Sequence, residues 1–339
     1  MSEDSRSHKR TRNEDQQALE ALVHDAEFWF DDGNIVLIAR DGTVFRVYRG
    51  LLAAQSTVFA DMFTSSSATA DEIYQGCPIV RVSDSPEELR HFLRVLCPKS
   101  RRLFYHDEKE TKVTFDQVCA VIRLAHKYHV EDIERQALSA LKAYYTHDFD
   151  QYEGLHHYDK NTLPIAFADL SGSQAVAAIK IARLTDTPSI LPLAFYHSCV
   201  LGGKVLDGYA REDGTIDHLE REDVKKCMDG RNPLGREALR IILRIFRDET
   251  CDQCPTPAQC ILALRGMLVD AVNLESSANC NVLNSWTGFM NDIAQLWGLC
   301  EVCRHALAAR DVKERRVTWR RLPEIFQLEV EDGDDDEHA

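Results

Sequence analysis

The residues of this sequence best suited to specific chemistry are two pairs of cysteines, each with two residues between its members. Cys251 and Cys254 form the first pair, and Cys300 and Cys303 form the second. Thiolates spaced in this way can bind one tetrahedral Zn²⁺ together, and four of them fill its coordination sphere. Such a site would be structural, because no coordination position stays open for a substrate.

The same cysteines also have a simpler interpretation as buried side chains. Cys300 and Cys303 fall within the apolar periodicity of residues 296–307, which predicts a helix on which cysteines three apart share one face. Free cysteines there pack as small hydrophobic groups between helices. We therefore expect no bound metal or other cofactor, and keep a structural zinc as the alternative, in which Cys260 or Cys280 could replace one ligand.

The sequence lacks the motifs that most often mark catalysis. It contains no G-x-S-x-G turn, no H-E-x-x-H pair and no glycine-rich phosphate loop. His126 and His129 are spaced to share a helix face, but they close a predicted helix, where an imidazolium suits the negative end of the dipole. We expect no enzyme activity and no catalytic residues.

The elements of the first half are predicted from turn and cap signals. Residues 34–39 and 43–48 are β-branched and apolar runs joined through Asp41 and Gly42, a pair typical of a tight hairpin turn. Two short helices, 51–54 and 58–63, follow, and a hydroxyl between them can cap the second.

A further strand and three helices complete this region. Residues 78–82 have strand chemistry, and the three helices have caps or apolar stripes of their own. Ser85 with Pro86 starts the first helix, and Thr114 starts the second. The third helix contains Ile133 and Leu141.

The segment from Phe45 to Phe63 resembles the signature of the BTB/POZ domain, F-x-V-H-(K/R)-x-x-L-x-x-x-S-x-x-F-x-x-M-F. The positions that match by residue type include Phe45, Leu52, Ser56, Phe59, Met62 and Phe63. Two positions depart from the pattern. Tyr48 stands where the family usually has histidine, and Asn34 stands where the first strand often begins with aspartate.

The resemblance implies an α+β fold over residues 28–146, with a small sheet and surrounding helices, that acts through its surfaces in protein–protein interaction. BTB domains commonly self-associate, and in many families they present a helical face to a cullin-type ubiquitin ligase scaffold. A homodimer and a cullin are therefore the implied partners, and the chain is expected to be an adaptor. Asn34 stands in place of an aspartate that is linked to one common dimer type, so the resemblance leaves it open whether the swapped dimer forms.

The cullin partner depends on a part of the sequence that only weakly matches the family. Ala70, Asp71 and Glu72 are similar to the hydrophobic-x-Glu element of some cullin-binding members, and the insertion 99–112 could reshape that face. The alternative function is a BTB-containing transcriptional regulator. That function needs a nucleic-acid-binding element, and the one basic candidate is the short segment 310–321.

Residues beyond the BTB-like region are predicted to form a helical domain, 147–328. Apolar positions three and four apart recur in residues 175–184, 237–246, 258–272 and 290–309. Three further segments are similar to the companions of this domain in the large BTB group expanded in fungi: residues 124–133, residues 181–184 with 190–196, and residues 319–328.

Charge and hydropathy limit the partners and the compartment. The formal net charge of −15 repels a phosphate backbone, which disfavours nucleic acid as a partner. We expect an intracellular protein, cytoplasmic or nuclear, with no membrane contact, because no apolar run has the length of a spanning helix and the start is polar. Residues 1–27 and the acidic 329–339 are predicted to be disordered ends.

Overall fold

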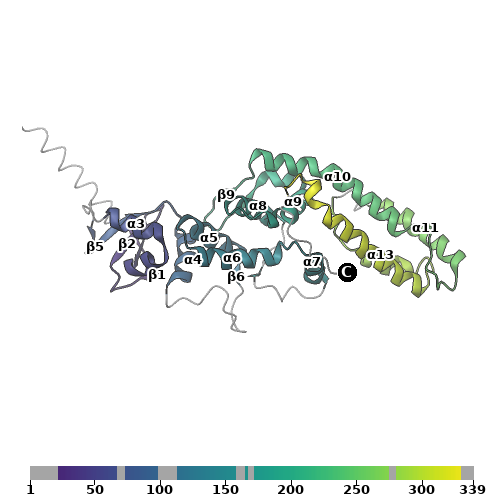
Figure 1. Ribbon diagram of the computed structural model, residues 1–339, viewed down its shortest axis with the longest axis horizontal. Coiled ribbons are helices and arrows are strands. Elements are labelled where there is room, and N and C mark those ends of the chain that lie inside the picture. The colour runs from purple at the N-terminus through teal and green to yellow at the C-terminus, as the bar shows by residue number, and fades with distance from the viewer. Residues whose placement is uncertain are drawn as a thin grey trace, which may run out of the picture. The chain divides into compact units, whose positions relative to one another are not determined.

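A computed structural model describes residues 22–66, 73–97, 113–157, 165–166, 172–274 and 280–329 (Figure 1). The chain divides into two compact units. The first unit runs to Ala143 and also includes Leu163–Ala168 and Ala210–Thr215, and the second unit holds the rest. The first combines a small mixed sheet with helices and the second is mainly helical, so the predicted α+β fold class is confirmed.

The first unit is built on a five-stranded sheet with the order β1-β3-β2-β5-β4. The predicted hairpin is present as the antiparallel pair β2–β3, turning at Gly42 with φ +91°. β5 pairs with β2 in parallel, and β1 pairs with β3 in parallel. The bounds are β1 (Val23–Trp29), β2 (Ile35–Ile38), β3 (Thr43–Val47), β4 (Ile73–Tyr74) and β5 (Cys77–Arg81).

Both faces of the central strand β2 are buried, which explains its continuous apolar sequence. Ile35 and Leu37 belong to the main core cluster, in which the sheet packs against helices. Val36 and Ile38 point to the other face and belong to a second, smaller cluster. The helices of this unit are α2 (Arg49–Gln55), α3 (Thr57–Ser66), α4 (Pro86–Leu96), α5 (Phe115–Lys127) and α6 (Glu131–Tyr144).

The predicted caps start α4 and α5. The Ser85 side chain accepts a hydrogen bond from the Glu88 backbone N–H at 3.3 Å. Thr114 and Gln117 form a complete capping box, in which each side chain accepts from the other residue's backbone N–H. Just before α5, the two-residue strand β6 (Val113–Thr114) pairs in parallel with β7 (Ile165–Ala166).

The start of the fold differs from the prediction that residues 1–27 are disordered. Strand β1 begins at Val23, and residues 1–21 lie outside the described part of the chain. The start of the strand escaped prediction because Asp25, the first of its two buried positions, is polar. Asp25 accepts hydrogen bonds from the backbone N–H groups of Glu27 and Phe28, and its other oxygen pairs with Arg90 Nε at 2.6 Å.

The boundary between the units also differs from the predicted 146/147 division. The segment Ala210–Thr215, which we assigned to the helical domain, clusters with the first unit. Its acidic side chains explain this: Glu212 lies 2.7 Å from His91 Nε2, and Asp213 lies 3.4 Å from Arg40. Such non-local ion pairs leave no trace in the local sequence pattern.

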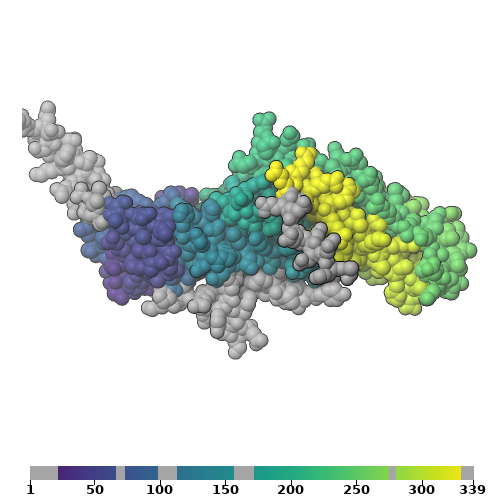
Figure 2. All heavy atoms as spheres, viewed as in Figure 1, coloured from purple at the N-terminus to yellow at the C-terminus, as the bar shows by residue number. Residues whose placement is uncertain are grey.

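The second unit is mainly helical, as expected. Consecutive helices pack against each other, and so do some helices that are far apart in the sequence. In Figure 1, α10 and α13 run side by side, and Figure 2 shows the yellow surface of α13 lying directly against the green surface beside it. The α-helices are α7 (Phe149–His157), α8 (Gln174–Leu184), α9 (Leu191–Val200), α10 (Arg221–Ile245), α11 (Pro257–Asn273), α12 (Thr287–Ala294), α13 (Glu301–Arg320) and α14 (Leu322–Ile325). Two 3₁₀ helices, η2 (Pro188–Ile190) and η3 (Gly202–Asp207), and the short strands β8 (Tyr209–Ala210) and β9 (Ile216–Asp217) connect them.

Two predicted helices have different bounds. The helix predicted over 290–309 is two helices, because the chain turns at Gly298 with φ +71° and the Leu299 N–H returns to the Ala294 carbonyl. The helix predicted over 237–246 is the end of α10, which continues through Pro233. The apolar periodicity continues across the turn at Gly298, so it gave no indication of that break. Pro233 is typical of a helix end, so the sequence gave no indication that α10 continues through it.

Candidate functional site

The residues that match the BTB/POZ signature lie together in the core of the first unit. Phe45, Leu52, Phe59 and Phe63 are all buried, and Met62 is half-buried against them. The Phe59 ring stacks on Phe63 and on Tyr128, with centroids 5.6 and 4.2 Å apart. The signature therefore marks the packing nucleus of the unit.

Ser56 joins two parts of that nucleus. Its buried hydroxyl donates to the Tyr128 carbonyl at 2.5 Å and accepts from the Phe59 N–H at 3.0 Å. The second bond caps the start of α3, and the first ties this start to the end of α5. The serine of the signature thus has a structural role in this chain.

Asn34 and Tyr48, the two departures from the signature, lie at the rim of the same nucleus. Asn34 Oδ1 accepts from the Arg49 N–H at 2.7 Å, at the start of α2. An aspartate oxygen could accept the same bond. The Tyr48 hydroxyl donates to Asp32 at 2.7 Å, and its ring stacks on Phe30. The hydrogen bond to Asp32, with burial, raises the pKa of Tyr48 and keeps the hydroxyl a donor.

A buried group of polar side chains, which the sequence analysis did not predict, lies beside Phe59 of the signature. The Tyr128 hydroxyl donates to Asp84, and Lys127 Nζ lies 2.6 Å from the other oxygen of the same carboxylate. Burial raises the pKa of Tyr128 well above its ordinary range, so the hydroxyl stays protonated. The signal available in the sequence was the acidic residue placed directly before the cap Ser85.

Two edge strands bound the five-stranded sheet in the described part of the first unit. β1 and β4 are the outermost strands. Val23 on β1 and Ile73 on β4 expose 66% and 60% of their surface. Residues 70–72 and 99–112, which bear on the cullin interpretation, lie outside the described part of the chain.

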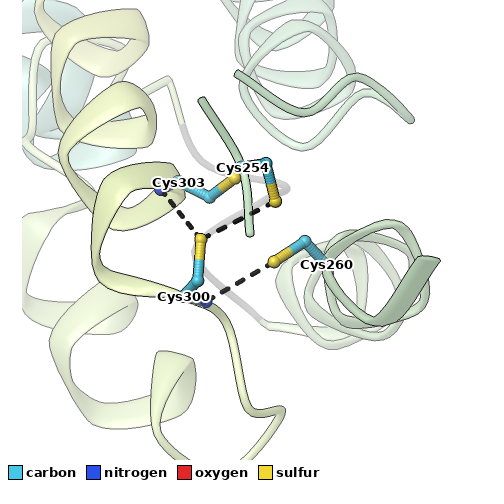
Figure 3. Close-up of side chains that lie close together, drawn as sticks. All are labelled: Cys254, Cys260, Cys300 and Cys303. Carbon is cyan, nitrogen blue, oxygen red and sulfur yellow. Dashed lines mark hydrogen bonds between the residues drawn. The ribbon is translucent and has the colours of Figure 1, made fainter. Parts of the chain in front are cut away.

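The thiol site of the second unit gathers cysteines from three segments (Figure 3). The sulfur atoms of Cys254, Cys260, Cys300 and Cys303 all lie within 4.8 Å of one another. The four therefore include Cys260, which was predicted only as a substitute ligand. Cys251, a predicted ligand, lies beside this group with its sulfur 3.4 Å from that of Cys303.

Local structure explains why these thiols converge. Cys254 ends a turn before α11, and Cys260 lies in the first turn of that helix. Cys300 is the N-cap of α13, and its sulfur accepts from the Cys303 N–H at 3.4 Å. The expectation that Cys300 and Cys303 lie within one continuous helix is wrong, because the break at Gly298 places Cys300 at a helix start.

The surroundings of Cys260 favour its thiolate. Burial acts to raise its pKa, but contacts with the Thr256 hydroxyl and the Cys300 backbone N–H, both at 3.5 Å, outweigh burial. Together with the neighbouring thiols they lower the pKa of Cys260 to about 7.

Other predicted candidates do not join a site. Cys280 lies apart, with its thiol donating to the Arg231 carbonyl at 3.5 Å. Within the described ranges, neither His126 nor His129 belongs to a group of potential metal ligands. His126 Nδ1 instead lies 3.0 Å from Glu134.

Four arginines of the basic segment 310–321 are engaged within the second unit. Arg310 donates to the carbonyls of Ile245 and Glu249. Arg315 is buried between Asp311 and Glu153, as the ion pairs of its guanidinium show. Two further arginines also meet carboxylates, Arg316 with Asp150 and Arg321 with Glu237.

Comparisons with known proteins agree with the geometry of the first unit. In the part of the chain that the structure describes, no helix combines the length and the apolar character needed to cross a membrane. A search of curated proteins found no match. Residues 30–144 match the family model of the BTB/POZ domain, whose members are generally modules for protein–protein interaction. The matched range holds the hairpin, the helical hairpin and the helices that enclose the signature residues, and residues 30–144 therefore form a BTB/POZ domain.

Proposed function

We propose that this chain is a protein-interaction adaptor whose BTB/POZ unit pairs with a second copy of itself. The observation that carries the proposal is the open sheet of the first unit. Its edge strands β1 and β4 each present an exposed apolar side chain, Val23 and Ile73. Unpaired backbone groups beside such side chains are where a strand from another chain can be added.

The mass of the full chain in solution tests self-association. Light scattering over a range of concentrations is expected to give twice the monomer mass, and Val23→Lys or Ile73→Lys is expected to shift the equilibrium toward monomer. The matched control is Leu206→Lys, which changes a residue 58% exposed in the second unit and is expected to leave the mass unchanged. A wild-type chain that stays monomeric at every concentration would contradict self-association.

The partner that we propose for the adaptor is a cullin-type ubiquitin ligase scaffold. The support is the BTB/POZ match together with the signature residues that build the core of the matched range. Capture of a purified cullin by the full chain tests this proposal. Failure to capture any cullin would remove this partner and leave self-association standing. We also propose that the chain belongs to the BTB group expanded in fungi, because residues 124–133, residues 181–184 with 190–196, and residues 319–328 are similar to that group.

The engagement of the basic segment favours the adaptor over a transcriptional regulator. DNA binding of that segment would need arginines free to meet phosphates. Arg315 and Arg316 are held by carboxylates of the second unit instead. A DNA pull-down at physiological salt is expected to recover no protein, and specific recovery would favour the regulator.

A further inference from the structure

We propose that the second unit holds a structural Zn²⁺ bound by the thiolates of Cys254, Cys260, Cys300 and Cys303. This site is independent of the BTB/POZ unit and of the proposed adaptor function. All four residues belong to the second unit, and they come from the turn before α11, the first turn of α11 and the start of α13.

The distances between the sulfur atoms suit zinc. A tetrahedral ion with Zn–S bonds of about 2.3 Å places its ligand sulfurs about 3.8 Å apart. The Cys254 and Cys300 sulfurs are 3.8 Å apart, and all four lie within 4.8 Å of one another. Figure 3 shows the side chains directed toward one another from separate segments. Four thiolates close the coordination sphere, so the site is structural and has no open position for catalysis.

Backbone donors support the charged form of the ligands. The Cys300 N–H points to the Cys260 sulfur, and the Cys303 N–H points to the Cys300 sulfur. N–H donors of this kind orient metal-bound thiolates and stabilise their charge. Cys260 and Cys303 also lie in the first turns of α11 and α13, where the partial positive charge of a helix start favours an anion. Binding releases to solvent one proton from each thiol that is still protonated.

The two cysteine pairs alone would choose Cys251 as the fourth ligand. The structure favours Cys260, because its sulfur belongs to the mutually close group, whereas that of Cys251 contacts Cys303 from outside this group. The ion would tie the turn that contains Cys254 to the starts of two long helices. Removal of zinc should therefore loosen both helix starts.

Zinc content of the purified full chain tests the site. The protein, kept reduced and free of chelator, is expected to contain one zinc per chain by elemental mass spectrometry. Cys254→Ser, Cys260→Ser, Cys300→Ser and Cys303→Ser should each lose it. Cys251→Ser should retain it, as should the matched control Cys280→Ser, which removes a buried thiol outside the group.

A second measurement does not depend on the variants folding. Replacing zinc by Co²⁺ in the wild-type chain should give the thiolate charge-transfer band and the strong visible bands of tetrahedral cobalt, and zinc should abolish both. A reduced wild-type chain that holds no zinc and gives no such spectrum would overturn the proposal. Loss of zinc from Cys251→Ser with retention in Cys260→Ser would overturn the assignment of the fourth ligand.

Discussion

Single side chains of the BTB/POZ signature act through bonds to distant parts of the first unit. Ser56 is the clearest case, because one hydroxyl both caps α3 and holds the carbonyl of Tyr128. That carbonyl lies in a fully packed region, where an acceptor without a donor is costly. The identity of this residue therefore matters for stability before it matters for any partner.

Replacing Ser56 by alanine tests this role. Loss of the cap and of the bond to Tyr128 should lower the free energy of unfolding by about 1–3 kcal/mol, as measured by urea denaturation. Thr57→Ala, an exposed neighbour in the same turn, serves as the control and should change stability by less than about 0.5 kcal/mol. Equal effects of the two substitutions would contradict the structural role of Ser56.

At the scale of elements, α10 shows how packing supports a helix that its sequence disfavours. It contains Pro233 together with Gly230 and Gly235, residues that weaken an isolated helix. Gly230 is required by close packing, because a Cβ there would lie 2.5 Å from the ring of Phe326. The Phe326 ring is itself buried and stacks on Phe195, so it has little room to move.

The two glycines of α10 should respond oppositely to alanine. Gly230→Ala should destabilise the chain by about 1–3 kcal/mol through overpacking against Phe326. Gly235→Ala meets no atom within 4 Å and should stabilise the helix by about 0.5–1 kcal/mol. Thermal unfolding of both variants beside the wild type measures the difference. A shift of the same sign in both would show that Phe326 does not restrict position 230.

At the scale of the molecule, the negative net charge coexists with arginines that carboxylates hold inside the second unit. Arg315 on α13 is the most buried of them, 1% exposed, and it joins Asp311 of its own helix to Glu153 of α7. The two carboxylates outweigh burial and raise the pKa of Arg315, which therefore stays charged. This group connects α13 to α7, which lies near the start of the second unit.

Removing the cation alone should be costly. Arg315→Met leaves the fully buried Asp311 carboxylate without its charge partner and should destabilise the second unit by about 3–5 kcal/mol. Adding Asp311→Asn to that variant removes the unpaired charge and should recover part of the loss, as a double-mutant cycle in denaturant would measure. Additive effects of the two substitutions would show that the ion pair contributes nothing of its own.

The sequence alone determined the local elements and the type of the first unit. The hairpin at Gly42, the caps at Ser85 and Thr114 and the hydrophobic spacing from Phe45 to Phe63 are all encoded by neighbouring residues. Such signals act over a few residues, so they are readable without coordinates. The helical character of the second half followed from periodicity in the same way, although the number of helices and several of their ends did not.

The tertiary structure decided which distant residues meet. Asp25 pairs with Arg90, and the strand that contains Asp25 begins at Val23. Phe326 packs on Gly230 of α10, the helix that continues through Pro233. The thiol group includes Cys260 in place of Cys251 because two helix starts converge there. Spacing along the chain cannot rank these alternatives, because each depends on contacts between segments far apart in sequence, and only the folded chain brings those segments together.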